Sequence, residues 1–412
     1  LEKHHKKKID LSLDRTFNLL EKLGNPQNKL NNIVNVVGTN AKASMAYSLK
    51  SILNVAGYKC NMYTSPHLVS YTERFVFNDN EISEDELVKL LSDVEKVLGK
   101  DNATIFEILT CAFYKYAENF KDNINIIESG LFYRVDPSSV FKKNILTLLG
   151  VCHSDHYKWL KNQSIDGVIY EKTSKLLNSN IFVNKQVNNE IKNKIEKSLE
   201  KNSSNKYFFG KHFEISRTKD NSIIYKDGLG EIKLPEPNIL GDHQLFNIST
   251  SIAASRKIFN VEEKDIKIGI QNISLKGRLQ EIKVGKLKNI AGSNKLIIDG
   301  GHNISSSYVI ANWIKNQKED VSLIVGMMKD KDHLEFMKSF EDIVKSVTII
   351  DIPNEQGAIS KENFKKKINN LRYDIKLATS IEDAIILNSK KNNKIILFIG
   401  SLYLCGKILS LN

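Results

Sequence analysis

The clearest pattern in the chain is a short apolar run followed by helical spacing. Residues 32–37 are mostly β-branched, and Gly38-Thr39-Asn40 come directly after them. Apolar side chains then recur at positions i, i+3, i+4 and i+7, namely Met45, Ala46, Leu49, Ile52, Leu53 and Ala56. This spacing predicts an amphipathic helix that ends at Gly57. Residues 58–63 return to a strand pattern, so the segment predicts strand, loop, helix and strand, the opening of a parallel α/β sheet.

Two further predicted strands extend this sheet, at residues 124–127 and 145–149, each flanked by helical stretches. From residue 188 to residue 225 the chain is polar and rich in Lys, Asn and Ser. Short alternating runs at 222–225 and, just beyond, at 231–234 predict a small β-rich excursion with loops.

A second α/β pattern begins after the run Leu275-Lys276-Gly277-Arg278. Helical segments separate its predicted strands, which lie at 295–298, 321–325, 346–350 and 394–398. The predicted fold class is therefore α/β. A mainly parallel sheet of the phosphate-loop type occupies an N-terminal domain (1–279), and a Rossmann-like sheet occupies a C-terminal domain (294–412), with a hinge at about residues 280–293.

Composition adds limits to this picture. The chain has 412 residues, enough for two or three domains with a core in each. No apolar run reaches the roughly eighteen residues of a membrane span, and the basic opening at residues 1–8 has no apolar segment behind it, so neither a span nor a secretory signal is expected. The four cysteines are far apart and lack zinc spacing, which predicts reduced thiols in the cytoplasm: Cys60, Cys111, Cys152 and Cys405.

The net charge of +12 raises nucleic acid as a partner. However, the lysines are spread among Asn and Glu, and the clusters at 6–8 and 365–367 are typical of solvated faces. No alternation of aromatic and basic residues suits base stacking. Nucleic acid is therefore not the expected partner, and a basic surface also suits a polyanionic small molecule.

A candidate phosphate loop follows the first predicted strand and reads Gly38-Thr39-Asn40-Ala41-Lys42-Ala43-Ser44. At a helix N-terminus, backbone N–H groups and the helix dipole attract phosphate, and Lys42 could neutralise the β and γ oxygens. The usual pattern has glycine before the lysine, where this chain has Ala41. Spacing alone supports a phosphate loop and an ordinary strand-to-helix turn equally.

Further motifs settle the family that the chain resembles. After the loop come Tyr63-Thr64-Ser65-Pro66-His67-Leu68, Tyr71-Thr72-Glu73-Arg74, Ile127-Glu128-Ser129-Gly130-Leu131, Arg134-Val135-Asp136, Asp155-His156, Trp159-Leu160 and Glu171-Lys172. Later come Leu240-Gly241-Asp242-His243-Gln244 with Asn247, Gly277-Arg278, Asp299-Gly300-Gly301-His302-Asn303, Gly326-Met327, Asp330-Lys331-Asp332 and Gly400-Ser401-Leu402-Tyr403. In this order they resemble the folylpolyglutamate synthase and dihydrofolate synthase family, relatives of the Mur ligases, over nearly the whole chain.

The resemblance implies an ATP-dependent ligase with magnesium as its metal. In the family, the γ-phosphoryl group of ATP passes to a carboxylate of dihydropteroate or a folate, and the amine of L-glutamate attacks the acyl phosphate. Such phosphoryl transfer relies on positioning and charge neutralisation. The resemblance also implies a cytoplasmic monomer with an ATP-binding domain at 1–279 and a glutamate-ligase domain at 294–412.

Metal ligands are carried over by matching positions. The resemblance assigns Ser65, Glu128 and His156 to a first magnesium. Lys172 matches a lysine that is carbamylated in the family, where it supplies an anionic oxygen to a second magnesium. Each residue also has a structural alternative: a turn for Ser65, a salt bridge for Glu128, a packed or surface position for His156, and a solvated position for Lys172.

The resemblance assigns nucleotide contacts to Asn247, Arg278 and Asp299, the last two from the hinge and the second domain, so domain closure would assemble the site. Lys42 with the loop backbone would hold the phosphates. His302 is a further candidate for placing substrate, which makes the catalytic candidates Lys42, Lys172 and His302. Arg278 could instead be a loop charge and Asp299 a turn residue, although a carboxylate at a strand end faces the ligand crevice of an α/β sheet.

The chain departs from the family near this site. Ala41 and Ala43 replace glycines of the loop, and Phe132 and Tyr133 replace two glycines that follow the metal carboxylate. If Ala41 takes a left-handed conformation, the cost is on the order of 1–2 kcal/mol, or roughly tenfold in affinity. The two aromatic residues could block substrate or reshape their loop. A catalytically impaired homologue is therefore the second interpretation, and a nucleic-acid-binding protein is the third.

Overall fold

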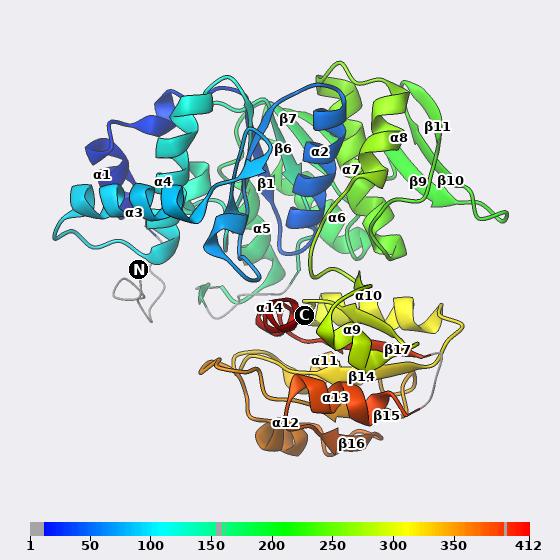
Figure 1. Ribbon diagram of the computed structural model, residues 1–412. Helices are drawn as coiled ribbons and strands as arrows, with labels where there is room; N and C mark the ends of the chain where they lie inside the picture. Colours follow the sequence, from blue (N-terminus) through cyan, green and yellow to red (C-terminus); the bar gives the residue numbers. More distant parts are fainter. Residues whose placement is uncertain (1–11, 154–158, 161, 391–393) are drawn as a thin grey trace. The chain divides into compact units, whose positions relative to one another are not determined.

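The computed structural model describes residues 12–153, 159–160, 162–390 and 394–412 and divides into two compact units (Figure 1). The first unit contains the described residues of Leu1–His67, Tyr71–Asn238 and Gln244–Ile273. The second unit contains Leu68–Ser70, Ile239–His243 and those of Ser274–Asn412. The predicted hinge at 280–293 holds a strand, β12 (Gln280–Ile282), and a helix, α9 (Lys286–Ala291), of the second unit.

The first unit is built on a mixed eight-stranded sheet in the order β4-β3-β2-β5-β1-β6-β7-β8. The six neighbouring strands β2, β5, β1, β6, β7 and β8 pair in parallel, whereas β3 and β4 form an antiparallel edge beside β2. The prediction of a mainly parallel sheet is therefore confirmed. The inner strands are buried along their whole length because both faces of the sheet are covered, and each carries one buried polar side chain within its apolar run: Asn35, Asn61, Asn125 and Thr147. The bounds are β1 Ile33–Val37, β2 Cys60–Tyr63, β3 Phe75–Phe77, β4 Asn80–Glu81, β5 Ile124–Glu128, β6 Leu146–Leu149, β7 Asn180–Val183 and β8 Asn205–Phe208.

Helices cover both faces of this sheet. Helix α2 packs on β1, β2 and β5 together with α8, while α1, α3 and α4 at one end and α5 and α6 at the other share apolar clusters with the sheet. The predicted helix after β1 is confirmed, and Gly57 takes a left-handed φ of 86° just beyond its end. The bounds are α1 Asp14–Lys22, α2 Lys42–Val55, α3 Glu84–Leu98, α4 Ile105–Ala117, α5 Ile165–Thr173, α6 Asn189–Ser198, α7 Asp242–Ile258 and α8 Glu263–Gln271, with single 3-10 turns η2 Pro26–Asn28, η3 Tyr71–Arg74, η4 Glu118–Phe120 and η5 Pro137–Ser139.

The β-rich excursion is smaller than the sequence predicted. A three-stranded antiparallel sheet forms from β9 (Phe213–Arg217), β10 (Ile223–Asp227) and β11 (Gly230–Leu234). However, the region from residue 188 to residue 208 is not part of it: α6 occupies Asn189–Ser198, and β8 joins the main sheet. Helix α6 was missed because only two of its side chains, Ile191 and Ile195, are buried, too few to form a recognisable apolar period.

The second unit is a six-stranded sheet in the order β12-β13-β17-β14-β15-β16, parallel except for β12. Its predicted strands are confirmed, and apolar clusters on both faces give the expected Rossmann-like layering. The remaining bounds are β13 Lys295–Ile298, β14 Val321–Val325, β15 Ser346–Ile349, β16 Asp374–Leu377, β17 Ile395–Ile399, α10 Ile304–Lys315, α11 His333–Lys338, α12 Lys361–Lys367, α13 Ile381–Asn388 and α14 Leu402–Leu411.

Helix α2 is held in place by a close contact with α8. A Cβ atom added to Gly269 of α8 would lie 2.7 Å from the Cα of Ile52 in α2, so only glycine allows this approach. The hydroxyl of Ser51 also donates to the backbone carbonyl of Gly269 at 2.7 Å. The position of α2 therefore depends on Gly269.

We predict that Gly269→Ala lowers the free energy of unfolding by about 1–3 kcal/mol, because the methyl group meets backbone that cannot move freely. Alanine has a higher intrinsic helix propensity than glycine, so propensity alone would make the Gly269→Ala protein more stable. A loss of stability would therefore report the steric contact. Urea denaturation measures it. Gly228→Ala is the control, since a Cβ atom there meets nothing within 4 Å. Equal effects of the two substitutions would contradict the close contact.

Candidate functional site

Four neighbouring parallel strands bring the candidate residues of the first unit to one edge of the sheet. Strand β1 pairs with β5 and β6, and β2 pairs with β5. The phosphate loop follows β1, Ser65 lies two residues after β2, Glu128 ends β5, and Gly150 follows β6. Ligands of open α/β sheets bind beyond these carboxyl ends. The topology thus places the loop beside Ser65 and Glu128, two of the three ligands predicted for the first magnesium.

Ala41 adopts the left-handed conformation that the loop requires. Its φ is 75° and its ψ is −12°, and it immediately precedes the first residue of α2, Lys42. The first intrahelical bond runs from the N–H of Met45 to the carbonyl of Ala41 at 2.9 Å. The amides of the first turn therefore point out of the helix end, where an anion can accept from them. Ala43, in contrast, lies within the helix.

The loop is fixed on one side by the segment after β6. The N–H groups of Thr39 and Asn40 both donate to the carbonyl of Val151, at 2.8 and 3.2 Å, and the N–H of Val151 donates back to Asn40 at 3.2 Å. The segment can come this close because a Cβ atom on Gly150 would lie only 2.5 Å from the carbonyl oxygen of Asn40. The loop therefore has one backbone path available to it.

Lys172 fixes the other side of the loop. It lies near the end of α5 with 1% of its surface exposed, so the alternative of a solvated position is excluded. Its Nζ donates to the carbonyl of Gly38 at 3.0 Å and to the carbonyl of Leu131 at 3.1 Å. The buried ammonium thus joins the phosphate loop to the loop that follows β5.

Glu128 and Lys42 form the charged centre of the site. The Glu128 carboxylate is 3% exposed, and its Oε1 lies 3.8 Å from the Nζ of Lys42. Its Oε2 accepts from the N–H of Ser65 at 3.2 Å. Lys42 also donates to the carbonyl of Thr39 at 3.3 Å. The structure therefore brings Lys42, Glu128 and Ser65 together, and the salt bridge is one of the roles of Glu128.

A buried amide network, which was not predicted, supports the segment after β6. The side-chain N–H2 of Gln186 donates to the carbonyl of Gly150 at 3.1 Å, and its oxygen accepts from the N–H of Cys152 at 3.0 Å. Asn184 donates to Asn247 at 2.7 Å. Asn184 and Gln186 follow β7, which was not predicted as a strand; a polar pair after a short apolar run was the available signal.

Asn247, a predicted nucleotide contact, belongs to this same network. It lies in the first unit with 5% of its surface exposed, and its amide group also donates to Gln244 at 2.9 Å. Its amide oxygen and nitrogen each have a protein partner in the structure. Asn247 is therefore held in one orientation by the amide network of Asn184 and Gln186 that supports the segment after β6.

The two aromatic departures do not project from the protein. Phe132 and Tyr133 are each 1% exposed, so both point into apolar surroundings and fill them. Phe132 packs with Leu160 and Val168, while Tyr133 joins the cluster under β1 and β6. Their rings are therefore core side chains that pack beneath the loop after β5.

A salt bridge and a buried carboxyl group hold the loop after β5. Arg134 donates from its Nε and NH2 groups to the carboxylate of Glu171, at 2.9–3.1 Å. Asp136 accepts from the N–H groups of Gly130 and Ser138, at 3.0 and 2.9 Å. Burial raises the pKa of Asp136 from 3.8 to about 6, although these hydrogen bonds act in the opposite direction.

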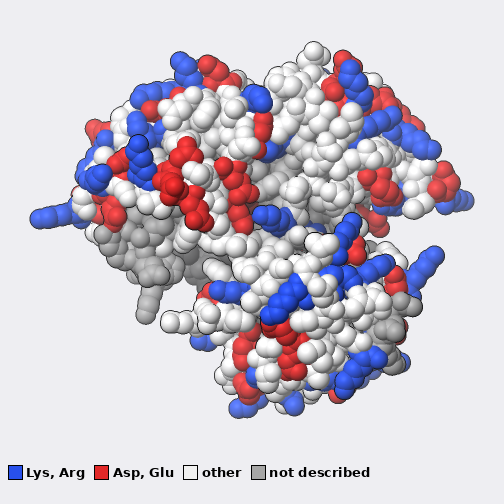
Figure 2. All heavy atoms as spheres, viewed as in Figure 1, with Lys and Arg blue, Asp and Glu red and all other residues white. Residues whose placement is uncertain are grey.

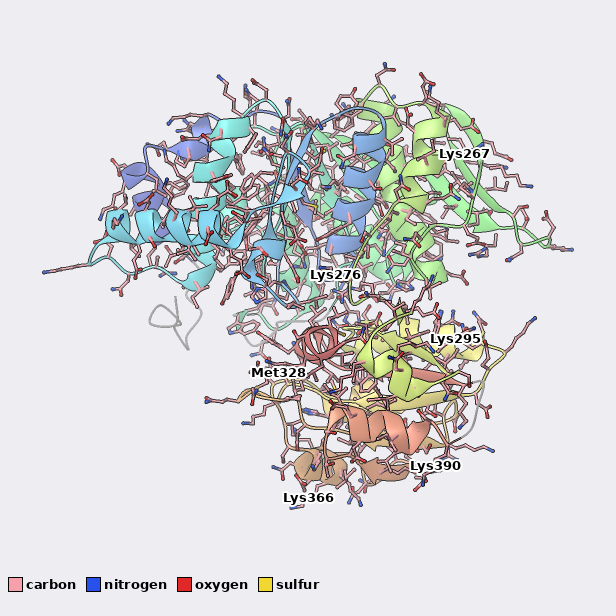
Figure 3. All side chains as sticks on the ribbon, in the orientation of Figure 1. Lys267, Lys276, Lys295, Met328, Lys366 and Lys390 are labelled. Carbon is pink, nitrogen blue, oxygen red and sulfur yellow. The ribbon has the colours of Figure 1, made fainter. Side chains whose placement is uncertain are left out.

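In the second unit, Asp299 follows β13, whose first residue, Lys295, is labelled in Figure 3. Its two carboxylate oxygens accept from the N–H groups of Gly301 and Leu279, at 2.7 and 2.8 Å. Burial raises the pKa of Asp299, and the positive charge of Arg278 opposes that shift. The turn predicted as an alternative role for Asp299 is therefore present, with Arg278 near it.

The remaining candidates are His302 and His156. The Nδ1 of His302 lies 2.8 Å from the carbonyl of Gly300, while Asn303 caps α10 by accepting from the N–H of Ser306 at 2.9 Å. His156 lies outside the described residues, as does Asp155. Among the described residues there is no group of three or more His, Cys, Asp or Glu side chains that could hold a metal ion.

Known proteins resemble the chain in sequence. The family model described as "Dihydrofolate synthetase, C-terminal domain" matches residues 280–411. The dihydrofolate synthetase of Saccharomyces cerevisiae is 23% identical and the dihydrofolate synthase/folylpolyglutamate synthase of Bacillus subtilis is 26% identical. The alignments cover 98% of this chain and 98% of the yeast protein, and 96% of this chain and 94% of the bacterial protein.

Solved structures share the fold. Escherichia coli FolC in complex with ADP superimposes with a TM-score of 0.84 at 23% identity, covering 98% of this chain and 94% of that chain. The bifunctional folylpolyglutamate synthase/dihydrofolate synthase of Yersinia pestis, complexed with AMPPNP and a Mn ion, gives a TM-score of 0.85 at 22% identity, covering 99% and 95%. The two-sheet architecture is thus that of these enzymes.

We predict that Ala41→Gly raises the free energy of unfolding of the first unit by about 1 kcal/mol, because glycine adopts a φ of 75° without steric cost. Ala43→Gly is a matched control in the same loop. It lies within α2, so it is expected to lower stability by up to about 1 kcal/mol through lost helix propensity. Chemical denaturation gives both values. Effects of the same sign would show that the loop is not strained at Ala41.

Asp136 predicts a pH dependence of stability. Its pKa is higher in the folded protein than in the unfolded chain, so the folded state holds this proton more tightly. The resulting stabilisation is complete below pH 3.8 and is lost as the pH rises through about 6. The loss amounts to as much as about 3 kcal/mol. Urea denaturation between these pH values is expected to show this slope in the wild type and not in Asp136→Asn. Parallel pH profiles for the two proteins would rule it out.

Proposed function

Because the chain belongs to the dihydrofolate synthase/folylpolyglutamate synthase family, we propose that it is an ATP-dependent ligase that joins L-glutamate to the carboxylate of dihydropteroate or a folate. ATP would phosphorylate that carboxylate, and the amine of glutamate would displace phosphate from the acyl phosphate. The observation that carries the proposal is the position of Lys42. It lies at the N-terminus of α2 and 3.8 Å from the buried Glu128.

The charges of this centre suit a triphosphate. The helix end and Lys42 supply positive charge where the β and γ phosphates would lie. Glu128 would repel phosphate if it faced the nucleotide without a cation between them. A carboxylate that is buried here beside the phosphate loop is therefore best explained as a ligand of the metal that accompanies ATP.

The oxygens of Glu128 and Ser65 fit magnesium, which prefers hard oxygen ligands and keeps several waters. These two residues would hold the ion, and its charge would neutralise the oxygens of the transferred phosphoryl group. His156 remains a proposed third ligand. Lys172 does not fit a metal as an ammonium, because its Nζ donates to two carbonyls, so its proposed role at a second metal requires carbamylation. As an amine it holds the loop.

Asn247, Arg278, Asp299 and His302 are kept as proposed contacts to nucleotide and substrate. Their support is the match of their positions to the family motifs. The hydrogen bonds that engage Asn247 and Asp299 favour fixed orientations, which suit residues that must present one polar atom to a ligand.

We propose that the protein acts as a monomer in the cytoplasm. The four cysteines are buried and none forms a disulfide, as expected in a reducing compartment. No helix within the described residues is long and apolar enough to cross a membrane. Nucleic acid is not a proposed partner. On the face seen in Figure 2, both units carry acidic as well as basic side chains.

The impaired homologue is retained as the second candidate because of Ala41. A left-handed alanine next to Lys42 carries strain, and its methyl group lies where the family has only hydrogen. Phe132 and Tyr133 are buried, so their rings do not project from the protein. We therefore propose a ligase with roughly tenfold weaker use of ATP than a glycine-containing loop would give.

The decisive assay is phosphate release from ATP in the presence of L-glutamate and either dihydropteroate or tetrahydrofolate. Phosphate release is expected to require glutamate and one of the two pterin substrates. Comparing the assay with dihydropteroate and the assay with tetrahydrofolate identifies the substrate that is used. Lys42→Ala is expected to lower kcat/KM by on the order of a hundredfold or more, because it removes charge at the transferred phosphoryl group. Ala41→Gly is expected to raise it by about tenfold.

Lys50→Ala is the matched control for Lys42→Ala. It removes another lysine of α2, whose Nζ lies 3.9 Å from Asp79 and not at the phosphate loop. Its kcat/KM is expected to stay within about twofold of the wild type. Absence of release in the wild type, with no recovery in Ala41→Gly or Ala43→Gly, would favour the impaired homologue instead.

A further inference from the structure

The first unit contains a cavity of about 580 Å³ that shares no lining residue with the phosphate loop, Glu128 or Lys172. Its walls come from β7 and β8, from the start of β9, from the β10–β11 hairpin and from the C-terminal half of α7. Figure 1 shows β9, β10 and β11 beside α7 in this unit. The volume lies in the usual range for small-molecule sites, roughly 300–1,000 Å³. The ligase chemistry proposed above gives this cavity no role.

One wall offers an aromatic face. Phe182 and Tyr207 are register partners on β7 and β8, and their rings stack with centroids 4.6 Å apart at 14°. Phe182 therefore covers one face of the Tyr207 ring. Because β8 is the last strand of the sheet, the other face of Tyr207 points beyond the sheet edge, into the space that the cavity occupies. A planar ring can stack on that face.

A second ring lies at an angle to the first. The imidazole of His212 meets Tyr207 edge-on, with centroids 6.0 Å apart. Its Nδ1 accepts from the N–H of Phe208 at 2.9 Å, so the neutral ring carries its proton on Nε2 and has a hydrogen-bond donor there. Burial and the charge of Lys211 lower the pKa of His212, which favours this neutral form. The aromatic wall thus includes a fixed donor.

The charges around the cavity favour an anion. Its lining contains three lysines, Lys211, Lys226 and Lys257, and two carboxylates, Glu214 and Asp227. The carboxylate of Asp227 is already paired with Arg256, whose Nε lies 3.0 Å away, and the ammonium of Lys226 is paired with Glu231 at 3.0 Å. Outside these two pairs the lining has two lysines, Lys211 and Lys257, and one carboxylate, Glu214. The ammonium of Lys257 lies over the Tyr207 ring, 5.9 Å from its centre, so a cation accompanies the aromatic face.

We propose that this cavity is a second ligand site, which binds a planar aromatic ring that carries anionic groups. The ring stacks on Tyr207, and the anionic groups are bound by Lys257 and the lysines at the rim. Two kinds of molecule share this chemistry: a mononucleotide with its phosphate, and a pteroylglutamate with its carboxylates. The cavity holds one small molecule, which distinguishes it from a track for a nucleic-acid strand.

Binding of AMP and of a pteroylpentaglutamate, tested separately by calorimetry, distinguishes the two sources. The full-length Lys42→Ala protein is used, because weakening the phosphate loop isolates the second site. One of the two probes is expected to bind with one equivalent per chain. Lys257→Ala and Tyr207→Leu, each added to Lys42→Ala, are expected to weaken that binding by about tenfold, since each removes one of the paired contacts. Leucine keeps the apolar contact with Phe182, and thermal unfolding verifies the fold.

Lys233→Ala is the matched control, because Lys233 lies on β11 of the same small sheet and does not line the cavity. It is expected to leave binding within about twofold. The proposal is overturned if neither probe binds at millimolar concentration, or if Lys233→Ala weakens binding as much as Lys257→Ala. It is also overturned if a single-stranded oligonucleotide competes at lower concentration than either probe. The readout is binding, so these outcomes do not depend on ligase activity.

Discussion

Three backbone hydrogen bonds between the phosphate loop and Val151 set the geometry on which the candidate active site depends. They fix Thr39 and Asn40 beside the strand next to β1, and the close approach is possible only because Gly150 has no side chain. The chain must then turn into α2 within one residue, and Ala41 makes that turn at a φ of 75°. The left-handed conformation of Ala41 thus follows from the position of the loop between β1 and α2.

The buried charges follow from the same geometry. Lys172, with its Nζ on the carbonyl of Gly38, holds the loop from the side opposite Val151, while Lys42 and Glu128 face each other at the helix end. A buried carboxylate and a buried ammonium are costly unless each has partners, so these residues indicate a site that is completed by ligands or by each other. The departures at Phe132 and Tyr133 leave this arrangement intact because both rings fill the core.

The parts of this structure that local pattern dictates could be predicted from the sequence. Local apolar patterns indicated the run before Gly38, the helix up to Gly57 and the strands β1, β2, β5, β6, β13, β14, β15 and β17, and the motif at 38–44 indicated its own place at a helix end. The other strands of the two sheets, β3, β4, β7, β8, β12 and β16, were not predicted. Features that depend on tertiary contacts could not be predicted from the sequence. The burial of Lys172 and the inward direction of Phe132 are decided by neighbours far away in the chain, and the amide network of Gln186 forms only once β7 lies beside β6. Helix α6 was missed because too few of its residues are apolar.

The most direct measurement is the affinity of the purified protein for a non-hydrolysable ATP analogue, titrated with and without magnesium. Our account requires tighter binding with the metal, and it requires Glu128→Gln to abolish most of that difference while leaving the metal-free affinity unchanged or stronger, since the carboxylate otherwise repels the phosphates. An affinity that does not respond to magnesium, or a magnesium response that survives in Glu128→Gln, would contradict the assignment of this carboxylate and with it the proposed site.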